Sequence, residues 1–181
     1  MAQVRSVPRL DGKQIYLREV RLTDIDAGYL RWMNDPEVNQ YLESRFHPLT
    51  RQDLEAFVTK MQTAPDNAFF AIVARDADKH VGNIKLGPIN RTHRTADIGL
   101  LIGEKDHWGR GIATEAIHLV TEYGFGTLNL HKLTAGCYSC NPSSARAFEK
   151  AGYAREGLRR EQFQSHGQFV DQILIGRVCP K

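Results

Sequence analysis

The sequence predicts an α/β fold, and three observations lead to that class. Apolar strand patterns alternate along the chain with amphipathic helix patterns. A glycine turn at residues 109–111 joins a β-rich apolar segment, 96–102, to a segment with helical spacing of its apolar residues. A further helix start follows at Asn141 and Pro142, because asparagine caps helices and proline suits their first position.

The elements of the first half follow from alternation and capping signals. Residues 14–20 alternate as a strand, and Thr23 or Asp24 offers a cap for the helix that follows. Thr50 caps a longer helix after an irregular stretch. The expected elements are a strand at 14–20, a helix to residue 34, a short helix from Pro36, a loop at 41–49, a helix at 50–62, and strands at 68–75 and 80–86.

The second half continues the alternation without a linker or repeat. We expect a strand at 95–102, a helix from 112, a strand at 132–137, a helix at 142–151, and strands at 153–161 and 168–177. A chain of 181 residues fits one domain over 1–181. Only the tails, 1–8 and 179–181, are expected to be loose.

The glycine turn is predicted to hold a diphosphate. Gly109 and Gly111 lack a Cβ, so the backbone can let a bulky anion approach its amides. The helix that follows leaves its first amides unpaired and carries partial positive charge there. The spacing fits neither a Walker loop nor a dinucleotide fingerprint, which disfavours nucleoside triphosphates and nicotinamides. A tight turn without a ligand remains the alternative from the glycines alone.

Three blocks carry a family resemblance. The run from Trp108 to Ala116, Trp-Gly-Arg-Gly-Ile-Ala-Thr-Glu-Ala, resembles the acetyl-coenzyme A loop of the GNAT acetyltransferases. Residues 141–153 resemble the next motif of that family, and residues 30–38 resemble the first helix pair of its RimJ/RimL-like branch. The resemblance implies a GNAT-like fold: a central mixed, mostly antiparallel sheet, splayed between its fourth and fifth strands, with helices on both faces.

The resemblance also implies acetyl-CoA as co-substrate and places its contacts. Pantetheine would pair with the fourth strand, where Gly99 would form a bulge. Asp106 stands where the family usually has Arg or Gln, so we expect its side chain to face solvent. The cofactor residues implied are Leu100, Leu101 and Ile102 on the strand, Trp108, Gly109, Arg110, Gly111, Ile112, Ala113 and Thr114 in the loop and helix, and Asn141, Ser144, Arg146 and Phe148 in the second motif.

The catalytic groups are less clearly indicated. Phe148 stands where many family members have a tyrosine that protonates the leaving thiolate. Ser144, a water or Tyr138 would have to replace it, and Ser144 is favoured. The base that deprotonates the amine could be Asp97, Glu43 or His47. Asp97 could equally make a strand-edge hydrogen bond, and His47 before Pro48 could be an ordinary turn residue.

The loop at 41–47 is the richest candidate for acceptor recognition, because it combines aromatic surface, a carboxylate and a guanidinium. Helix residues before it could line the same cleft, although Trp32 could equally be a core residue. The substrate-binding residues predicted here are Trp32, Asn34, Glu43, Arg45, Phe46 and His47.

Composition excludes several partners. The net charge of +3 comes without a dense Lys/Arg run, which argues against nucleic acid, and no apolar run is long enough for a membrane span or secretory signal. Three cysteines cannot all pair, so free thiols in a reducing, cytoplasmic setting are expected. The single CxxC spacing, Cys137 to Cys140, lacks further ligands for zinc, and no metal is expected.

The function expected is transfer of acetyl from acetyl-CoA to a primary amine by direct attack in a ternary complex, because the motifs place no cysteine for an acetyl-enzyme. The acceptor could be a protein N-terminus, the amino group of a sugar nucleotide used in cell-surface glycan synthesis, or another small amine. A non-catalytic acyl-CoA sensor and a purely structural domain are the alternatives from other classes. A homodimer is compatible with all of these.

Overall fold

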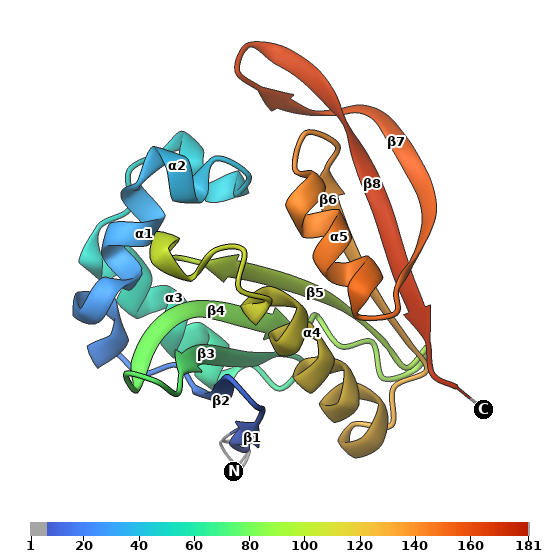
Figure 1. Ribbon diagram of the computed structural model, residues 1–181, viewed down its shortest axis with the longest axis horizontal. Helices are drawn as coiled ribbons and strands as arrows, with labels where there is room; N and C mark the ends of the chain where they lie inside the picture. Colours follow the sequence, from blue (N-terminus) through green and yellow to red (C-terminus); the bar gives the residue numbers. More distant parts are fainter. Residues whose placement is uncertain (1–6, 181) are drawn as a thin grey trace.

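The computed structural model describes residues 7–180, so the tails expected to be loose lie mostly outside the described part of the chain. Within those residues, eight strands form one sheet in the order β1-β2-β3-β4-β5-β6-β8-β7 (Figure 1). Neighbouring strands are antiparallel except β5 and β6, which are parallel. The strands are β1 (Leu10–Asp11), β2 (Ile15–Glu19), β3 (Ala68–Ala74), β4 (Lys79–Leu86), β5 (Thr95–Ile102), β6 (Lys132–Tyr138), β7 (Ala154–Ser165) and β8 (Gln168–Val178).

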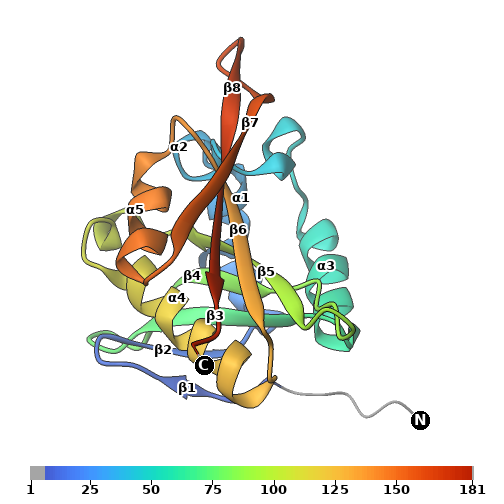
Figure 2. The same cartoon turned by 90° about the vertical axis from the view of Figure 1, so that its right-hand side faces the viewer.

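Helices cover both faces of this sheet (Figure 2). Alternate residues of β3 face opposite sides: Phe70 and Ile72 join the core beneath α4 and α5, whereas Phe69 and Val73 join the core beneath η1, α1 and α3. The helical segments are η1 (Ile25–Tyr29), α1 (Leu30–Asn34), α2 (Pro36–Asn39), η2 (Glu43–Phe46), α3 (Arg51–Thr63), η3 (Lys105–His107), α4 (Ile112–Glu122), η4 (Tyr123–Thr127) and α5 (Pro142–Lys150).

The sheet splays between β5 and β6. These strands pair only where Thr95, Ala96 and Asp97 meet the residues from Lys132 to Thr134. Beyond that point β5 stays paired with β4 as far as Ile102, and β6 stays paired with β8 along its whole length. The predicted splay between the fourth and fifth long strands is therefore confirmed.

Two helix starts follow the predicted capping signals. Thr50 and Asp53 form a reciprocal capping box at the start of α3. The Asn141 side chain accepts a hydrogen bond from the Ser144 amide, and Pro142 occupies the first turn of α5. Both signals are local, and neither is overridden by a distant contact.

Other expectations need correction. The helix predicted up to residue 34 is broken at Gly28, whose backbone leaves the helical region (φ 161°, ψ −25°). Asp24 makes no cap hydrogen bond, because its carboxylate binds the Arg18 guanidinium at 2.7 and 2.8 Å and accepts from the Arg21 amide. Gly99 is not a bulge, since it pairs with Lys85 in an uninterrupted register.

The end of β5 is anchored to the first helical layer through Trp32. The Trp32 Nε1 donates to Glu104 Oε1 at 2.7 Å, and Lys79 Nζ lies 2.7 Å from Glu104 Oε2. Burial tends to raise the pKa of Glu104, but Lys79, Trp32 and Arg31 hold it below its usual value. The indole packs so closely that a Cβ on Gly103 would stand 2.0 Å from Trp32 Cδ2.

This packing predicts an unequal response to two Gly→Ala substitutions. Gly103→Ala should lower the free energy of unfolding by about 1–3 kcal/mol, because the new methyl must displace the Trp32 ring. The control is Gly126→Ala in η4, where a Cβ meets nothing within 4 Å and stability should stay within about 0.5 kcal/mol. Urea unfolding of both variants measures the difference, and equal midpoints would contradict the account of the Trp32 packing.

Candidate active site

The splay leaves one backbone edge of β5 without a strand partner. Asp97 O accepts from Gly87 N at 2.8 Å, and Gly103 N donates to Val81 O at 2.8 Å, so the odd-numbered residues of β5 hydrogen-bond with β4. The backbone groups of Ile98, Leu100 and Ile102 therefore point toward the gap. Of the three strand residues predicted to bind pantetheine, Leu100 and Ile102 present their backbone there, and the Leu101 backbone belongs to the β4 ladder.

The glycine loop joins this strand to α4. Gly109 (φ 74°) and Gly111 (φ 84°) adopt left-handed backbone conformations that side chains with a Cβ rarely take. Gly111 is the N-cap of α4 and offers no side chain, so no side-chain cap occupies the first-turn amides of Ile112, Ala113 and Thr114. Such a helix end suits an anion.

Side chains around the loop keep its amides accessible. The Asp106 carboxylate, 63% exposed, turns to His107 Nδ1 at 2.7 Å. The expectation that Asp106 faces solvent is confirmed. Trp108 Nε1 donates to Ile102 O at 2.8 Å, which ties the loop back to the end of β5. Arg110 is exposed.

The N-terminus of α5 forms the other wall of the gap. Ser144 lies half-buried in the first turn of α5, beside the thiol of Cys137 on β6. Burial raises the pKa of that Cys137 thiol, and the Ser144 contact opposes the rise. Arg146 is exposed, whereas Phe148 is buried and packs edge-on against Tyr153, with ring centroids 5.3 Å apart.

Asp97 marks the closed end of the gap. It is exposed on the last pair of residues that joins β5 to β6, and it accepts a hydrogen bond from Thr134 Oγ1. This is the strand-edge hydrogen bond that was the alternative to a role of Asp97 as the base. The Asp97 carboxylate nevertheless remains exposed to solvent.

The loop at 41–47, which we call the bridging segment, spans the open end of the gap. Tyr41 donates its hydroxyl to Cys140 O at 3.1 Å, beyond the end of β6. Arg45 donates through Nη1 to the Tyr138 hydroxyl at 2.8 Å and through Nη2 to Gln164 O at 2.5 Å. The segment therefore connects the first helical layer to both β6 and β7.

Two residues of the bridging segment, Glu43 and Arg45, hydrogen-bond to the Tyr138 hydroxyl. This hydroxyl donates to Glu43 Oε1 and accepts from Arg45, and the Tyr138 ring stacks on Phe163 at 4.1 Å. Burial first, and Glu43 second, raise the pKa of Tyr138. Because its proton is held by Glu43, Tyr138 is poorly placed to protonate a thiolate. Phe46 is half exposed, and the Arg45 guanidinium lies 4.1 Å above its ring.

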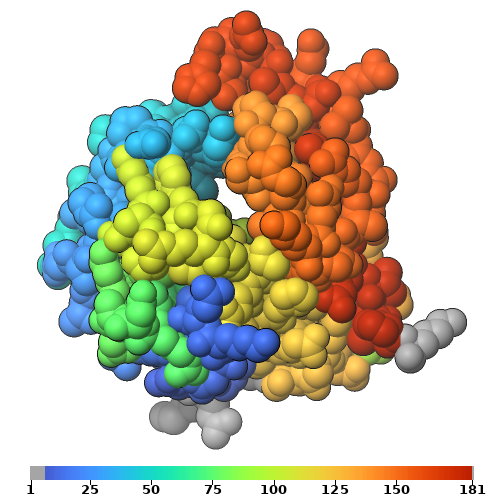
Figure 3. All heavy atoms as spheres, viewed as in Figure 1, coloured from blue at the N-terminus to red at the C-terminus, as the bar shows by residue number. Residues whose placement is uncertain are grey.

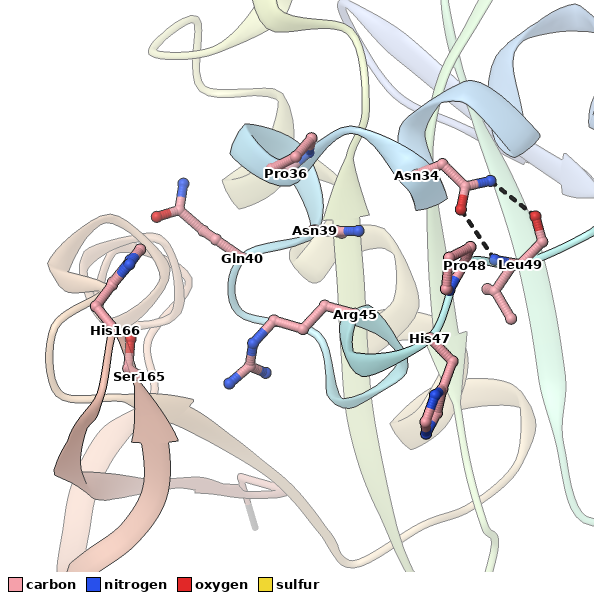
Figure 4. Close-up of a pocket in the computed structure, with 10 residues that line it drawn as sticks. All are labelled: Asn34, Pro36, Asn39, Gln40, Arg45, His47, Pro48, Leu49, Ser165 and His166. Carbon is pink, nitrogen blue, oxygen red and sulfur yellow. Dashed lines mark hydrogen bonds between the residues drawn. The ribbon is translucent and has the colours of Figure 1, made fainter.

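A cavity of about 530 Å³ lies beside the bridging segment (Figure 4). Its walls come from α1, α2, the bridging segment and the turn between β7 and β8. Just beyond the bridging segment, Asn34 donates to Leu49 O at 2.8 Å and accepts from Leu49 N at 2.9 Å. The lining residues are Asn34, Pro36, Asn39, Gln40, Arg45, His47, Pro48, Leu49, Ser165 and His166.

The structure thus places only part of the predicted acceptor set around this cavity. Asn34, Arg45 and His47 line it, while Trp32 is fully buried in the core and offers no surface. The contribution of the β7–β8 turn was missed. Ser165-His166-Gly167 could have indicated it, since a glycine in a two-residue turn between strand patterns is a hairpin signal.

The space-filling view shows an opening through the molecule between the loop that leads into α4, in yellow, and α5, in orange (Figure 3). The glycine loop lies on the side of α4, and the cavity lies on the side of α1 and α2. All three cysteines are free. No group of three or more potential metal ligands occurs within residues 7–180, and no helix there could span a membrane.

Comparison with known proteins agrees with this geometry. A family profile described as an acetyltransferase (GNAT) domain matches residues 14–154. Spermidine N(1)-acetyltransferase from Vibrio cholerae is 35% identical over 84% of this chain and 89% of its own length. The probable N-acetyltransferase YjcK from Bacillus subtilis is 31% identical over 94% of this chain and 97% of its own.

Solved structures show the same fold. The spermidine N-acetyltransferase of Vibrio cholerae, in complex with CoA and spermine, superposes with a TM-score of 0.82 and 25% identity over 92% of this chain and 96% of that one. A GNAT-family acetyltransferase from Bacillus anthracis superposes with a TM-score of 0.81 over 94% and 98%, at 24% identity. The chain belongs to the GNAT family and is an acetyl-CoA-dependent N-acetyltransferase.

Proposed function

We propose that this enzyme acetylates the primary amine of a small molecule by direct attack in a ternary complex. The observation that carries the proposal is the backbone edge of β5 beyond Asp97, which has no strand partner and runs beside the glycine loop. The cavity beside the bridging segment, about 530 Å³, has the size of a small-molecule binding site. Relatives named spermidine acetyltransferases support a small amine as acceptor.

The residues present fit acetyl-CoA, which supplies an activated acetyl thioester. The first-turn amides of α4 and the loop from Trp108 to Gly111 would bind the diphosphate, with Arg110 and Arg146 exposed nearby for further anionic groups. The Leu100 backbone and the Ile102 amide would pair with pantetheine, since the Ile102 carbonyl accepts from Trp108 Nε1. An amide of β5 directed at the developing oxyanion would contribute about 3 kcal/mol to the lowering of the barrier.

Proton transfers would involve groups at the two ends of the gap. Asp97 at the closed end and Glu43 at the bridging segment are the carboxylates available as base, directly or through water. Ser144 in the first turn of α5 is the proposed proton donor to the departing thiolate, and the helix N-terminus stabilises that anion.

The finer assignments belong to the same proposal. We place the chain in the RimJ/RimL-like branch because of the helix pair at 30–38, and in one domain because of its length. A cytoplasmic location is proposed because the three cysteines are free, and the proposal is compatible with a homodimer. A protein N-terminus or a sugar-nucleotide amine remains an acceptor class to be tested alongside other small amines.

The deciding experiment is CoA release measured with acetyl-CoA and a panel of peptides, amino sugars, sugar nucleotides and polyamines. Turnover on a small amine supports the proposal. Acetyl-CoA binding without turnover on any acceptor would identify an acyl-CoA sensor instead, and failure to bind acetyl-CoA would leave only a structural role.

The glycine loop predicts a backbone effect on cofactor affinity. Gly111→Ala should weaken acetyl-CoA binding about tenfold, because a Cβ in the left-handed region costs roughly 1–2 kcal/mol while meeting only Gln14 at 3.9 Å. Gly111→Asn should lose less, since asparagine tolerates this conformation. Calorimetry of both folded variants checks this, and unchanged affinity in each would remove the loop from the site.

Ser144 predicts a kinetic effect without a binding effect. Ser144→Ala should lower kcat by about 10- to 100-fold and leave acetyl-CoA affinity nearly unchanged, if its hydroxyl protonates the thiolate. The neighbouring Ser143→Ala is the matched control, because Ser143 is exposed one residue earlier on the same helix. Wild-type kcat in Ser144→Ala would exclude the serine as the acid.

A further inference from the structure

We infer that the acceptor amine carries a negatively charged group, a carboxylate or a phosphate, and that this group binds in the cavity beside the bridging segment. The inference rests on the proposed function and narrows its substrate class. It excludes polyamines, which the relatives named spermidine acetyltransferases would suggest.

The charge of the cavity lining carries the first step. Its ionisable side chains are those of Arg45, His47 and His166, and none of its ten lining residues is an aspartate or glutamate. The carboxylates of Asp35 and Glu37, which flank the lining residue Pro36, both contact Lys105 Nζ, at 2.8 and 2.5 Å, and its single ammonium offsets one of their two negative charges. The lining itself therefore offers a guanidinium, two imidazoles and neutral groups to a ligand.

The geometry of Arg45 carries the second step. Three hydrogen bonds, to Leu42 O, the Tyr138 hydroxyl and Gln164 O, fix the guanidinium in place, and its side chain is only 13% exposed. The Glu43 carboxylate, which is not part of the lining, lies 3.9 Å from Arg45 Nη1 on the side away from Nε. The Arg45 Nε–H and one Nη2 hydrogen have no partner within residues 7–180. A guanidinium held in advance with two free donors suits a carboxylate or phosphate, which it can bind through two hydrogen bonds.

The opposite wall supplies polar groups that complement this donor. Figure 4 shows Arg45 and Gln40 extending from the helical side toward the β7–β8 turn, where His166 and Ser165 lie. A polyamine would place several ammonium groups beside the Arg45 charge, and the carboxylate paired with Arg45, Glu43, already accepts from the Tyr138 hydroxyl. An anionic group would instead be bound by the free Arg45 donors. The cavity thus selects acceptors by charge.

Matched acceptor pairs test this class. Lysine differs from cadaverine by a carboxylate, and glucosamine 6-phosphate differs from glucosamine by a phosphate. We expect kcat/KM at least about tenfold higher for the anionic member of one pair, which also identifies the anion, and lower values for spermidine. Equal or higher kcat/KM for spermidine, cadaverine and glucosamine would overturn the inference while leaving the proposed function intact. If none of these amines and no amine of the wider panel is acetylated, both the inference and the proposed function are overturned.

A second test of the inference changes the charge inside the cavity. His166 has a positive φ of 48°, which aspartate and asparagine both tolerate, so His166→Asp and His166→Asn differ mainly by one negative charge. Relative to His166→Asn, His166→Asp should lower kcat/KM for the preferred anionic acceptor about tenfold and leave the acetyl-CoA KM unchanged. Thr59→Glu, at an exposed position of α3 ten residues along the chain from the lining residue Leu49, makes the same change in net charge. The inference fails if the two His166 variants behave alike, or if Thr59→Glu reproduces the loss.

Discussion

The separation of β5 from β6 beyond Asp97 is the constraint on which the site depends. Each strand is fully paired on its other side, β5 with β4 and β6 with β8, so each follows a different half of the sheet. The half that contains β5 is held to the first helical layer by Trp32 and Glu104. A gap between two rigid halves leaves polar backbone groups that a substrate can use without any strand being displaced.

An open strand edge is also a hazard, because it can pair with another chain. Here the bridging segment crosses the open end of the gap, with Tyr41 bonded to Cys140 O and Arg45 bonded to Tyr138 and Gln164 O. Arg45 and His47 of the same segment also line the candidate acceptor cavity. The bridging segment therefore both covers the open end of the gap and forms one wall of the candidate acceptor cavity.

The parts of the structure that the sequence predicts well are those set by neighbours along the chain. The caps at Thr50 and Asn141 act within three residues, and the glycine loop depends on its own backbone, so these features could be located in advance. The parts that it predicts poorly depend on distant partners. Asp24 was expected to cap a helix, but a strand arginine binds it. The position of Arg45 is set by Tyr138 and Gln164, 93 and 119 residues away, and the sequence does not indicate these partners.

The buried face of α5 bears on how a thiolate could leave. Phe148 packs against Tyr153, whose hydroxyl is 2.7 Å from Thr121 Oγ1 and whose pKa burial raises to about 12. The Tyr153 phenol is therefore held in a buried hydrogen bond and is a poor proton donor to the thiolate. Tyr138, on β6, donates its hydroxyl hydrogen to Glu43. Within the proposed mechanism, charge on the departing sulfur must then be met at the first turn of α5, where the Ser144 hydroxyl and the helix N-terminus coincide.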